Sequence, residues 1–332
     1  MDEASATEVT VLGRGLAFGE DSEEEPLFRS LPRDSVRVGV GRSGLTLDGA
    51  PVVGRAVRLR ARGEEPLLQV LGRMVRGDVV VHLNDDALEV VNVIPLEDYV
   101  ASVLAAEMPM GFPSEALKAQ AVAVRTYALQ RKLAAHGKPW HLGSTVLHQV
   151  YRGERPGDER ARIAAEATRG EVLTWELAPI EAYFHSSCGG RTETGKDALS
   201  RDLPYLAAVD CPCRNASPKA WTLDVTGPEL AALGGDAMRI AARSSTGRAR
   251  LLRVGGRWMD GAELRRKLGY QRLKSLDFQV EPVREGVRIE GRGWGHGAGM
   301  CQWGARALAE QRWDYHRILG YYYPGTEMQR LY

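Results

Sequence analysis

The stretch IPLEDYVASVLAAEMP, residues 94–109, marks the point at which the apolar pattern of this chain changes. Its apolar residues recur at helical spacing, which favours an α-helix. Pro95 suits the first turn of a helix, where the backbone N–H has no intrahelical partner, and Met108–Pro109 ends the pattern. We therefore expect a helix here, with a domain boundary near residue 92.

Ahead of this stretch, apolar residues alternate with polar ones. A period of two, interrupted by Gly and Asp, is typical of short, half-buried antiparallel strands. The alternating positions are Val36, Val38 and Val40; Val57, Leu59 and Ala61; Val79, Val81 and Leu83; and Leu88 and Val90. The sequence predicts a small β-rich module over residues 34–92, preceded by a poorly ordered acidic leader over residues 1–33.

Behind it, a second helix is expected from Ser114, a favoured N-cap residue, to about Ala135. We also expect mixed strands and loops at residues 146–180 and an inserted subdomain at 225–275. A strand at 286–290, a glycine-rich loop at 291–299 and a final helix from about 302 should follow. The prediction is an α+β fold. Its mixed catalytic core would span residues 93–332, with paired helices carrying the site.

Composition and charge exclude some classes of function. The 332 residues include 44 Lys and Arg against 43 Asp and Glu, so the net charge is +1 and no overall field attracts nucleic acid. Hydrophobic residues make up 44% and charged residues 26%, and no run approaches the roughly 18 apolar residues of a membrane helix. We expect no transmembrane segment. The acidic start, residues 1–15, lacks the features of a secretory signal.

Glu107 continues the apolar stripe of the first helix, because it lies seven residues after Val100. We expect its carboxyl group to point toward the core. Burial raises a carboxyl pKa and keeps the group protonated near neutral pH, as a general acid requires. The small neighbours Ala105 and Ala106 leave space for a substrate. The alternative is an ordinary solvated glutamate.

The second helix places Lys118 and Arg125 on one face, beside Thr126 and Tyr127. These cations could orient a polar ligand, or they could form a solvated basic face.

The glycine-rich loop carries one histidine among five glycines, in GRGWGHGAG, residues 291–299. It loosely matches a dinucleotide fingerprint, but it lies too near the end of the sequence for a βαβ unit to follow, so we reject nucleotide binding. We expect the glycines to let the backbone approach a ligand, with His296 and the flat ring of Trp294 facing a sugar. A tight turn with an incidental histidine is the alternative.

Several blocks together resemble the stage II sporulation protein D (SpoIID/LytB) family, which contains lytic transglycosylases of peptidoglycan. The matching blocks are IPLEDYVASVLAAEMP (94–109), FPSEALKAQAVAVRTYAL (112–129), HQVYRGE (148–154), EAYFHSSCGGRTE (181–193), GRGWGHGAGMCQWGARALAEQ (291–311) and ILGYYYPGT (318–326). The resemblance implies that Glu107 is the catalytic acid/base and that Lys118 and Arg125 line the cleft. It also places Gln149, Tyr151 and His296 near the site.

The resemblance further implies cleavage between N-acetylmuramic acid and N-acetylglucosamine in peptide-stripped glycan, giving a 1,6-anhydro product. One carboxyl group is sufficient for this reaction, because the muramic C6 hydroxyl is the nucleophile. An amidase would act first, and the location would be the cell envelope. A non-enzymatic, glycan-binding enhancer of an amidase and a zinc hydrolase are the competing functions.

The cysteines suggest a metal site. His185, Cys188, Cys211 and Cys213 supply ligand types that zinc takes in tetrahedral sites, although Cys-x-Cys is tighter than the usual spacing. Zinc binding in relatives of the family near this block supports one structural Zn²⁺, which the chemistry would not require. A disulfide from Cys188 to Cys211 or Cys213 is the alternative. We expect Cys301 to be a small buried hydrophobic residue.

Overall fold

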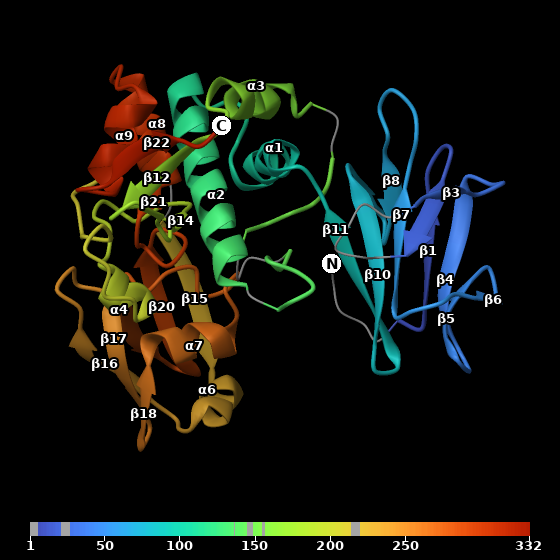
Figure 1. The fold of residues 1–332 in the computed structure, drawn as a ribbon. Coiled ribbons are helices and arrows are strands. Elements are labelled where there is room, and N and C mark those ends of the chain that lie inside the picture. Colours follow the sequence, from blue (N-terminus) through green and yellow to red (C-terminus); the bar gives the residue numbers. More distant parts are fainter. Residues whose placement is uncertain (1–5, 21–26, 136, 145–148, 155–156, 214–219) are drawn as a thin grey trace. The chain divides into compact units, whose positions relative to one another are not determined.

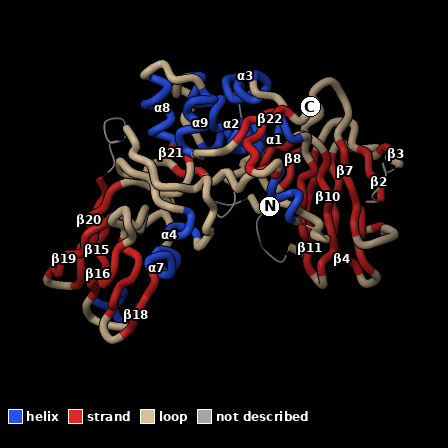
Figure 2. The backbone as a smooth tube through the Cα atoms, turned by 60° about the vertical axis from the view of Figure 1, so that its left-hand side comes forward, coloured by secondary structure: helices blue, strands red, loops and turns tan. Residues whose placement is uncertain are grey.

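The fold, obtained as a computed structural model, is α+β, as predicted (Figures 1 and 2). The structure describes residues 6–20, 27–135, 137–144, 149–154, 157–213 and 220–332. The chain divides into two compact units, residues 1–110 with 128–169 and residues 111–127 with 170–332. In the described part of the chain, no helix is long and apolar enough to cross a membrane.

The first unit contains a β-module of two sheets, drawn in blue to cyan in Figure 1. One sheet has the strand order β6-β5-β4-β1-β8-β9, and the other has the order β11-β10-β7-β2-β3. The strands are β1 (Glu8–Leu12), β2 (Ala17–Glu20), β3 (Arg29–Ser30), β4 (Ser35–Gly41), β5 (Gly44–Leu47), β6 (Ala50–Pro51), β7 (Ala56–Arg60), β8 (Leu68–Val70), β9 (Arg73–Val75), β10 (Asp78–Asn84) and β11 (Ala87–Val93). The strands predicted from alternation are therefore confirmed as β4, β7, β10 and β11.

The β-module begins earlier than expected. β1 pairs with β4 and β8, and β2 pairs with β7. Val11 and Leu16 are fully buried. The expectation of a poorly ordered leader over residues 1–33 is thus corrected for its described residues, because β1 pairs with a strand on each side and buries Val9 and Val11. Most of the acidic run that prompted it lies outside the described residues.

Tight hairpins set the register of the module. Asp48–Gly49 joins β5 to β6 and Leu71–Gly72 joins β8 to β9, and all four residues have positive φ. Two consecutive residues of positive φ form the turn whose twist matches that of paired strands.

The helices of the first unit follow the β-module. α1 (Leu96–Glu107) begins after Pro95, its N-cap, and ends at Met108. Val100, Val103 and Leu104 on its apolar face are buried. The predicted helix is therefore confirmed. α3 (Glu159–Ala167) packs against α1.

The second unit begins with α2 (Ser114–Ala134), whose residues up to Tyr127 belong to it. The predicted second helix is confirmed. Pairing brings distant segments together here: β12 (Glu171–Trp175) pairs with β22 (Glu327–Arg330) and with β13 (Ala178–Pro179), and β14 (Phe184–His185) runs parallel to β21 (Met300–Cys301). The helices around them are α4 (Gly195–Leu199), α8 (Gln302–Glu310) and α9 (Tyr315–Tyr322).

The expected insertion is a compact part of this second unit. Its elements are β15 (Ala220–Thr226), α6 (Gly227–Leu233), β16 (Met238–Arg243), β17 (Ala249–Val254), β18 (Arg257–Asp260), α7 (Gly261–Leu268), β19 (Phe278–Val283) and β20 (Gly286–Arg292). They share one hydrophobic core that runs from Trp221 to Ile289. The range is wider than the expected 225–275, because the sheet β15-β20-β19 packs on the same core as the sheet β16-β17-β18.

Candidate active site

Glu107 is the last residue of α1 and is partly buried. The backbone N–H of Val150 donates a 2.7 Å hydrogen bond to its Oε1 atom. Burial raises the pKa of the Glu107 carboxyl, and this effect exceeds the lowering by the Val150 hydrogen bond and the charge of Arg152. The group therefore stays protonated to higher pH than a solvated glutamate, which is the property a general acid needs.

Gln149 and Tyr151 flank Val150, and both side chains are buried. The Tyr99 hydroxyl on α1 donates a 2.8 Å hydrogen bond to Oε1 of Gln149, and the Tyr99 and Tyr151 rings stack with centroids 5.6 Å apart. Tyr151 in turn donates a 2.5 Å hydrogen bond to Oδ1 of Asn92 on β11. The structure thus brings Gln149 and Tyr151 beside Glu107, as neighbours that support the segment donating to it.

The α2 residues of the predicted site have structural partners inside the second unit. Arg125 is fully buried and donates a 3.1 Å hydrogen bond to the carbonyl of Glu171. Tyr127 is buried with its ring edge on Tyr183. Lys118 is partly exposed and forms a 2.8 Å ion pair with Glu115. Of the three, Lys118 retains accessible surface for a ligand.

The glycine-rich loop packs against the segment that contains β14. A Cβ atom at Gly299 would lie 2.0 Å from the Tyr183 carbonyl oxygen, and one at Gly295 would lie 2.6 Å from Cβ of His185. Both glycines have positive φ. These glycines therefore permit close contact within the protein, whereas we expected them to let the backbone approach a ligand.

The loop side chains contribute to the same packing. The Nε2 atom of His296 lies 2.9 Å from the Phe184 carbonyl oxygen, and its Nδ1 atom accepts a 3.1 Å hydrogen bond from the Ala298 N–H. Burial lowers the pKa of His296 to about 4, so the ring is neutral and acts as a brace for the loop. Trp294 is partly exposed, and the Lys274 ammonium lies 4.8 Å from its ring centroid.

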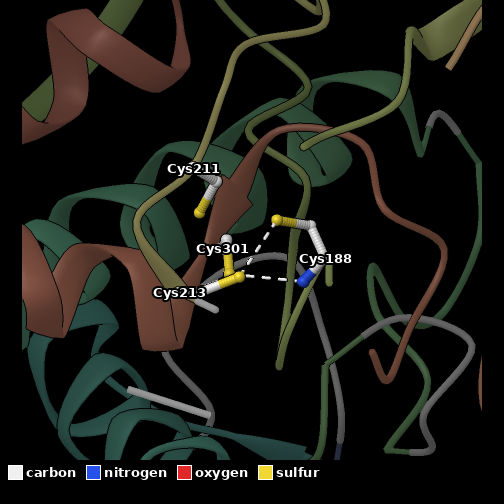
Figure 3. Close-up of side chains that lie close together, drawn as sticks. All are labelled: Cys188, Cys211, Cys213 and Cys301. Atoms are coloured by element: carbon white, nitrogen blue, oxygen red, sulfur yellow. Dashed lines mark hydrogen bonds between the residues drawn. The ribbon is translucent and has the colours of Figure 1, made fainter. Parts of the chain in front are cut away.

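Four buried cysteines form a cluster in the second unit (Figure 3). The sulfurs of Cys188, Cys211, Cys213 and Cys301 all lie within 4.8 Å of one another. All four are free thiols, and the Cys188 and Cys213 sulfurs are 3.4 Å apart. Cys301 on β21 provides the fourth sulfur, whereas the expected fourth ligand was His185. Cys301 is buried, as expected, but its sulfur also belongs to the cluster, which the sequence did not indicate.

His185 has a different environment. Its Nδ1 atom lies 3.1 Å from the Ala298 carbonyl oxygen, and its buried Nε2 atom has no hydrogen-bond partner among the described residues. In the parallel pairing of β14 with β21, His185 is registered with Cys301. Sequence spacing alone therefore could not show which of these two neighbours, His185 or Cys301, completes the cluster.

The cluster has the ligand number and type of a structural zinc site. Tetrahedral Zn–S bonds of about 2.3 Å place sulfurs about 3.8 Å apart, a spacing that four sulfurs within 4.8 Å of one another can reach. Hydrogen bonds from the other three thiols lower the pKa of Cys213. Four sulfur ligands would close the coordination sphere.

A buried polar network supports the Cys188 loop, and the sequence did not reveal it. Arg248 donates hydrogen bonds to the carbonyls of Cys188 and Arg191, at 2.7 and 2.8 Å. Buried Glu193 accepts 2.5 Å hydrogen bonds from Ser244 and Thr246. Tyr99 was also missed, although it lies eight residues before Glu107 and so on the same helix face.

These features define an α+β protein in which a partly buried acid ends one helix and a compact, buried cysteine cluster lies in the second unit. Comparison with known proteins gives the family. The family model described as stage II sporulation protein matches residues 84–175. The stage II sporulation protein D of Bacillus amyloliquefaciens is 35% identical over 260 residues, covering 71% of this chain and 74% of that protein. The chain belongs to the stage II sporulation protein D family.

Two other relatives extend the comparison. An uncharacterized protein of Brachyspira hyodysenteriae is 32% identical over 330 residues, covering 96% of this chain and 89% of that protein. The amidase enhancer of Bacillus subtilis is 30% identical over 285 residues, covering 68% of this chain and 39% of that protein. The first match includes nearly the whole chain.

Proposed function

We propose that this protein is a lytic transglycosylase, a glycosidic-bond-cleaving lyase that acts on the glycan strands of peptidoglycan in the cell envelope. The observation that carries the proposal is Glu107, a partly buried acid with a raised pKa inside the stretch matched by the family model. The amidase-enhancer relative adds support for a role at the cell wall. The substrate would be glycan from which an amidase has removed the stem peptides.

The mechanism needs one carboxyl group that acts twice. Glu107, protonated, would give its proton to the glycosidic oxygen between N-acetylmuramic acid and N-acetylglucosamine as that bond breaks. The carboxylate would then accept the proton of the muramic C6 hydroxyl as this oxygen bonds to C1. The product is a 1,6-anhydro sugar, with no water consumed. Since the nucleophile belongs to the substrate, proximity supplies several kcal/mol of the barrier reduction.

The other predicted site residues divide into two proposed roles. Lys118 and Trp294 are partly exposed, so we assign them contacts with the glycan. Trp294 would stack on a sugar ring, and the Lys118 ammonium would bind its polar groups. The remaining residues are buried or bonded to the backbone, and we assign them support of the site; these are Arg125, Tyr127, Gln149, Tyr151 and His296.

Product analysis of a Glu107→Gln variant tests the function. Glutamine keeps the shape and an oxygen that can accept the Val150 hydrogen bond, but it cannot supply the proton. We expect Glu107→Gln to release anhydro ends from peptide-free glycan at least about a hundredfold more slowly than wild type, measured by mass spectrometry. The matched control Glu166→Gln changes an exposed carboxyl on α3 and should retain activity. Retained activity in Glu107→Gln would contradict the mechanism, and reducing ends in place of anhydro ends would identify a hydrolase.

The similarity to the amidase enhancer favours one second candidate function, a protein that binds wall glycan and stimulates an amidase without cutting the strand. This function needs a binding surface but no acid at Glu107. Two results together would favour this candidate. Wild-type protein would release no anhydro product, and wild type and Glu107→Gln would accelerate peptide release by an amidase equally.

The cysteine cluster is proposed to hold one structural Zn²⁺ through Cys188, Cys211, Cys213 and Cys301. The ion would cross-link the loop that carries Cys188 to β21. A closed set of four sulfurs leaves no position for an activated water, which argues against a zinc hydrolase. Metal analysis of protein purified without chelator should give about one equivalent of zinc per chain, and less than about a tenth of an equivalent would reject the proposal.

A further inference from the structure

The segment Gln149–Glu154, which donates to Glu107, is bound along the β-module of the same unit. β9 is the last strand of the six-stranded sheet, and this segment occupies its outer edge. The Glu154 N–H donates a 2.7 Å hydrogen bond to the Met74 carbonyl oxygen, and Nη1 of Arg73 donates a 3.0 Å hydrogen bond to the Tyr151 carbonyl oxygen. β9 therefore holds two backbone groups that follow Val150 in the chain, the Tyr151 carbonyl and the Glu154 N–H.

Side chains hold the same segment at a second strand. Asn92 on β11 accepts the Tyr151 hydroxyl through Oδ1, and its Nδ2 atom donates to the carbonyls of Arg76 and Asp78, at 2.8 and 2.9 Å. Because both the oxygen and the nitrogen of the Asn92 amide make hydrogen bonds, the orientation of this side chain is determined. Glu154 adds ion pairs to Arg76, at 3.2 Å, and to Arg162 on α3.

Gly153 is essential to this contact. It has a φ of +73°, and a Cβ atom there would lie 2.1 Å from the Met74 carbonyl oxygen. A real Cβ cannot approach so closely, so any larger residue would push the segment away from β9. The sequence supplies glycine at this close crossing of the segment over β9.

We propose that the N-terminal β-module positions the catalytic acid: β9 and Asn92 hold Tyr151–Glu154 so that the Val150 N–H is directed at Oε1 of Glu107. Because Oε1 accepts this hydrogen bond in both protonation states, the acidic proton resides on Oε2. Arg73, Asn92 and Gly153 are thus positioning residues that act on the acid through Val150. This inference rests on the proposed transglycosylase function.

A pH effect follows from the geometry. A hydrogen bond to the carboxylate lowers its pKa, so a displaced Val150 would leave Glu107 protonated to higher pH. The charged groups around the segment are Arg152 and Glu154 on the segment itself, Arg73 and Arg76 of the β-module, and Arg162 from α3. An acid that must be protonated loses activity as pH rises through its pKa. The basic limb of the pH–activity profile should therefore move to higher pH when the contact with β9 is broken.

Gly153→Ala and Gly72→Ala form a matched pair of variants in the full chain. Gly72 has a φ of +72°, and a Cβ atom there meets nothing within 4 Å. Both variants carry the same backbone strain, and only Gly153→Ala meets Met74. We expect Gly153→Ala to lower kcat/KM on peptide-free glycan about fivefold, the equivalent of one weakened hydrogen bond, and to shift the basic limb upward. Gly72→Ala should follow wild type.

Two further measurements complete the test. Arg73→Met removes the donor to the Tyr151 carbonyl without a backbone clash, and it should shift the same limb if Gly153→Ala does not fold. The titration of Glu107, followed by ¹³C NMR and assigned with Glu107→Gln, should move to higher pH in both variants without any substrate present. An unchanged titration and an unchanged limb, with activity merely reduced, would overturn the positioning role. Loss of the transglycosylase function itself would appear separately, as a wild type that makes no anhydro product.

Discussion

The Val150 N–H donates a 2.7 Å hydrogen bond to Oε1 of Glu107, and burial nevertheless raises the pKa of this carboxyl above its ordinary value. Two opposing effects thus act on one group. Desolvation keeps the proton on the acid, while one backbone donor restrains the carboxyl and favours its ionised form. A group with both properties can give a proton and then take one, as a single acid/base must.

Glu107→Gln should stabilise the fold at neutral pH. The folded state raises the Glu107 pKa, so it binds this proton more tightly than the unfolded chain does. Stability from this group is therefore fully present below the unfolded pKa, near 4.5, and is lost as pH rises through the higher folded value. Urea unfolding at pH 4 and pH 8 should show the stability of Glu107→Gln over wild type increasing with pH. A constant difference would contradict the pKa shift.

His296 should make the protein sensitive to acid. Its folded pKa is about 4, against 6.5 when unperturbed, so its contribution to stability is complete above pH 6.5 and is lost as pH falls toward 4. A shift of this size corresponds to at most about 3.5 kcal/mol. His296→Gln should lose less stability than wild type between pH 7.5 and 4.5 in urea titrations. The control His316→Gln changes an exposed histidine and should behave as wild type.

Two substitutions distinguish the ligand sets of the metal site. Cys301→Ser should reduce bound zinc below about a tenth of an equivalent, since a hydroxyl is a poor substitute for thiolate. His185→Gln should keep about one equivalent, because the four sulfurs form the cluster without it. Metal content is to be measured on the folded fraction of each variant. If Cys301→Ser kept its zinc and His185→Gln lost it, the ligands would instead be His185, Cys188, Cys211 and Cys213.

Gly299→Ala should destabilise the second unit strongly. The new Cβ would lie 2.0 Å from the Tyr183 carbonyl oxygen at a φ of +69°, next to the pairing of β14 with β21. We expect a loss of about 3 kcal/mol or more in the free energy of unfolding. Gly247→Ala is the matched control in the same unit, with a φ of +93° and nothing within 4 Å, and should cost about 1 kcal/mol. Equal losses in the two variants would show that strain, and not the contact, is responsible.

Part of the site could be predicted from local pattern. Helical spacing indicated that Glu107 faces inward, because a helix repeats its faces every three to four residues. The same spacing placed Lys118 and Arg125 together but could not say what covers their face. Arg125 is buried against the carbonyl of Glu171, forty-six residues later, and no local rule contains that contact.

The sequence alone determined the period of several segments, and hence the strands β4, β7, β10 and β11 and the limits of α1 and α2. These properties depend on neighbours within a few residues. Tertiary structure decided the rest: that Cys301 completes the cysteine cluster, that the loop glycines pack on β14, and that β9 holds the donor to Glu107. Each of these depends on a backbone approach between segments far apart in the chain, where packing and hydrogen bonding select one pairing among many that the local pattern permits.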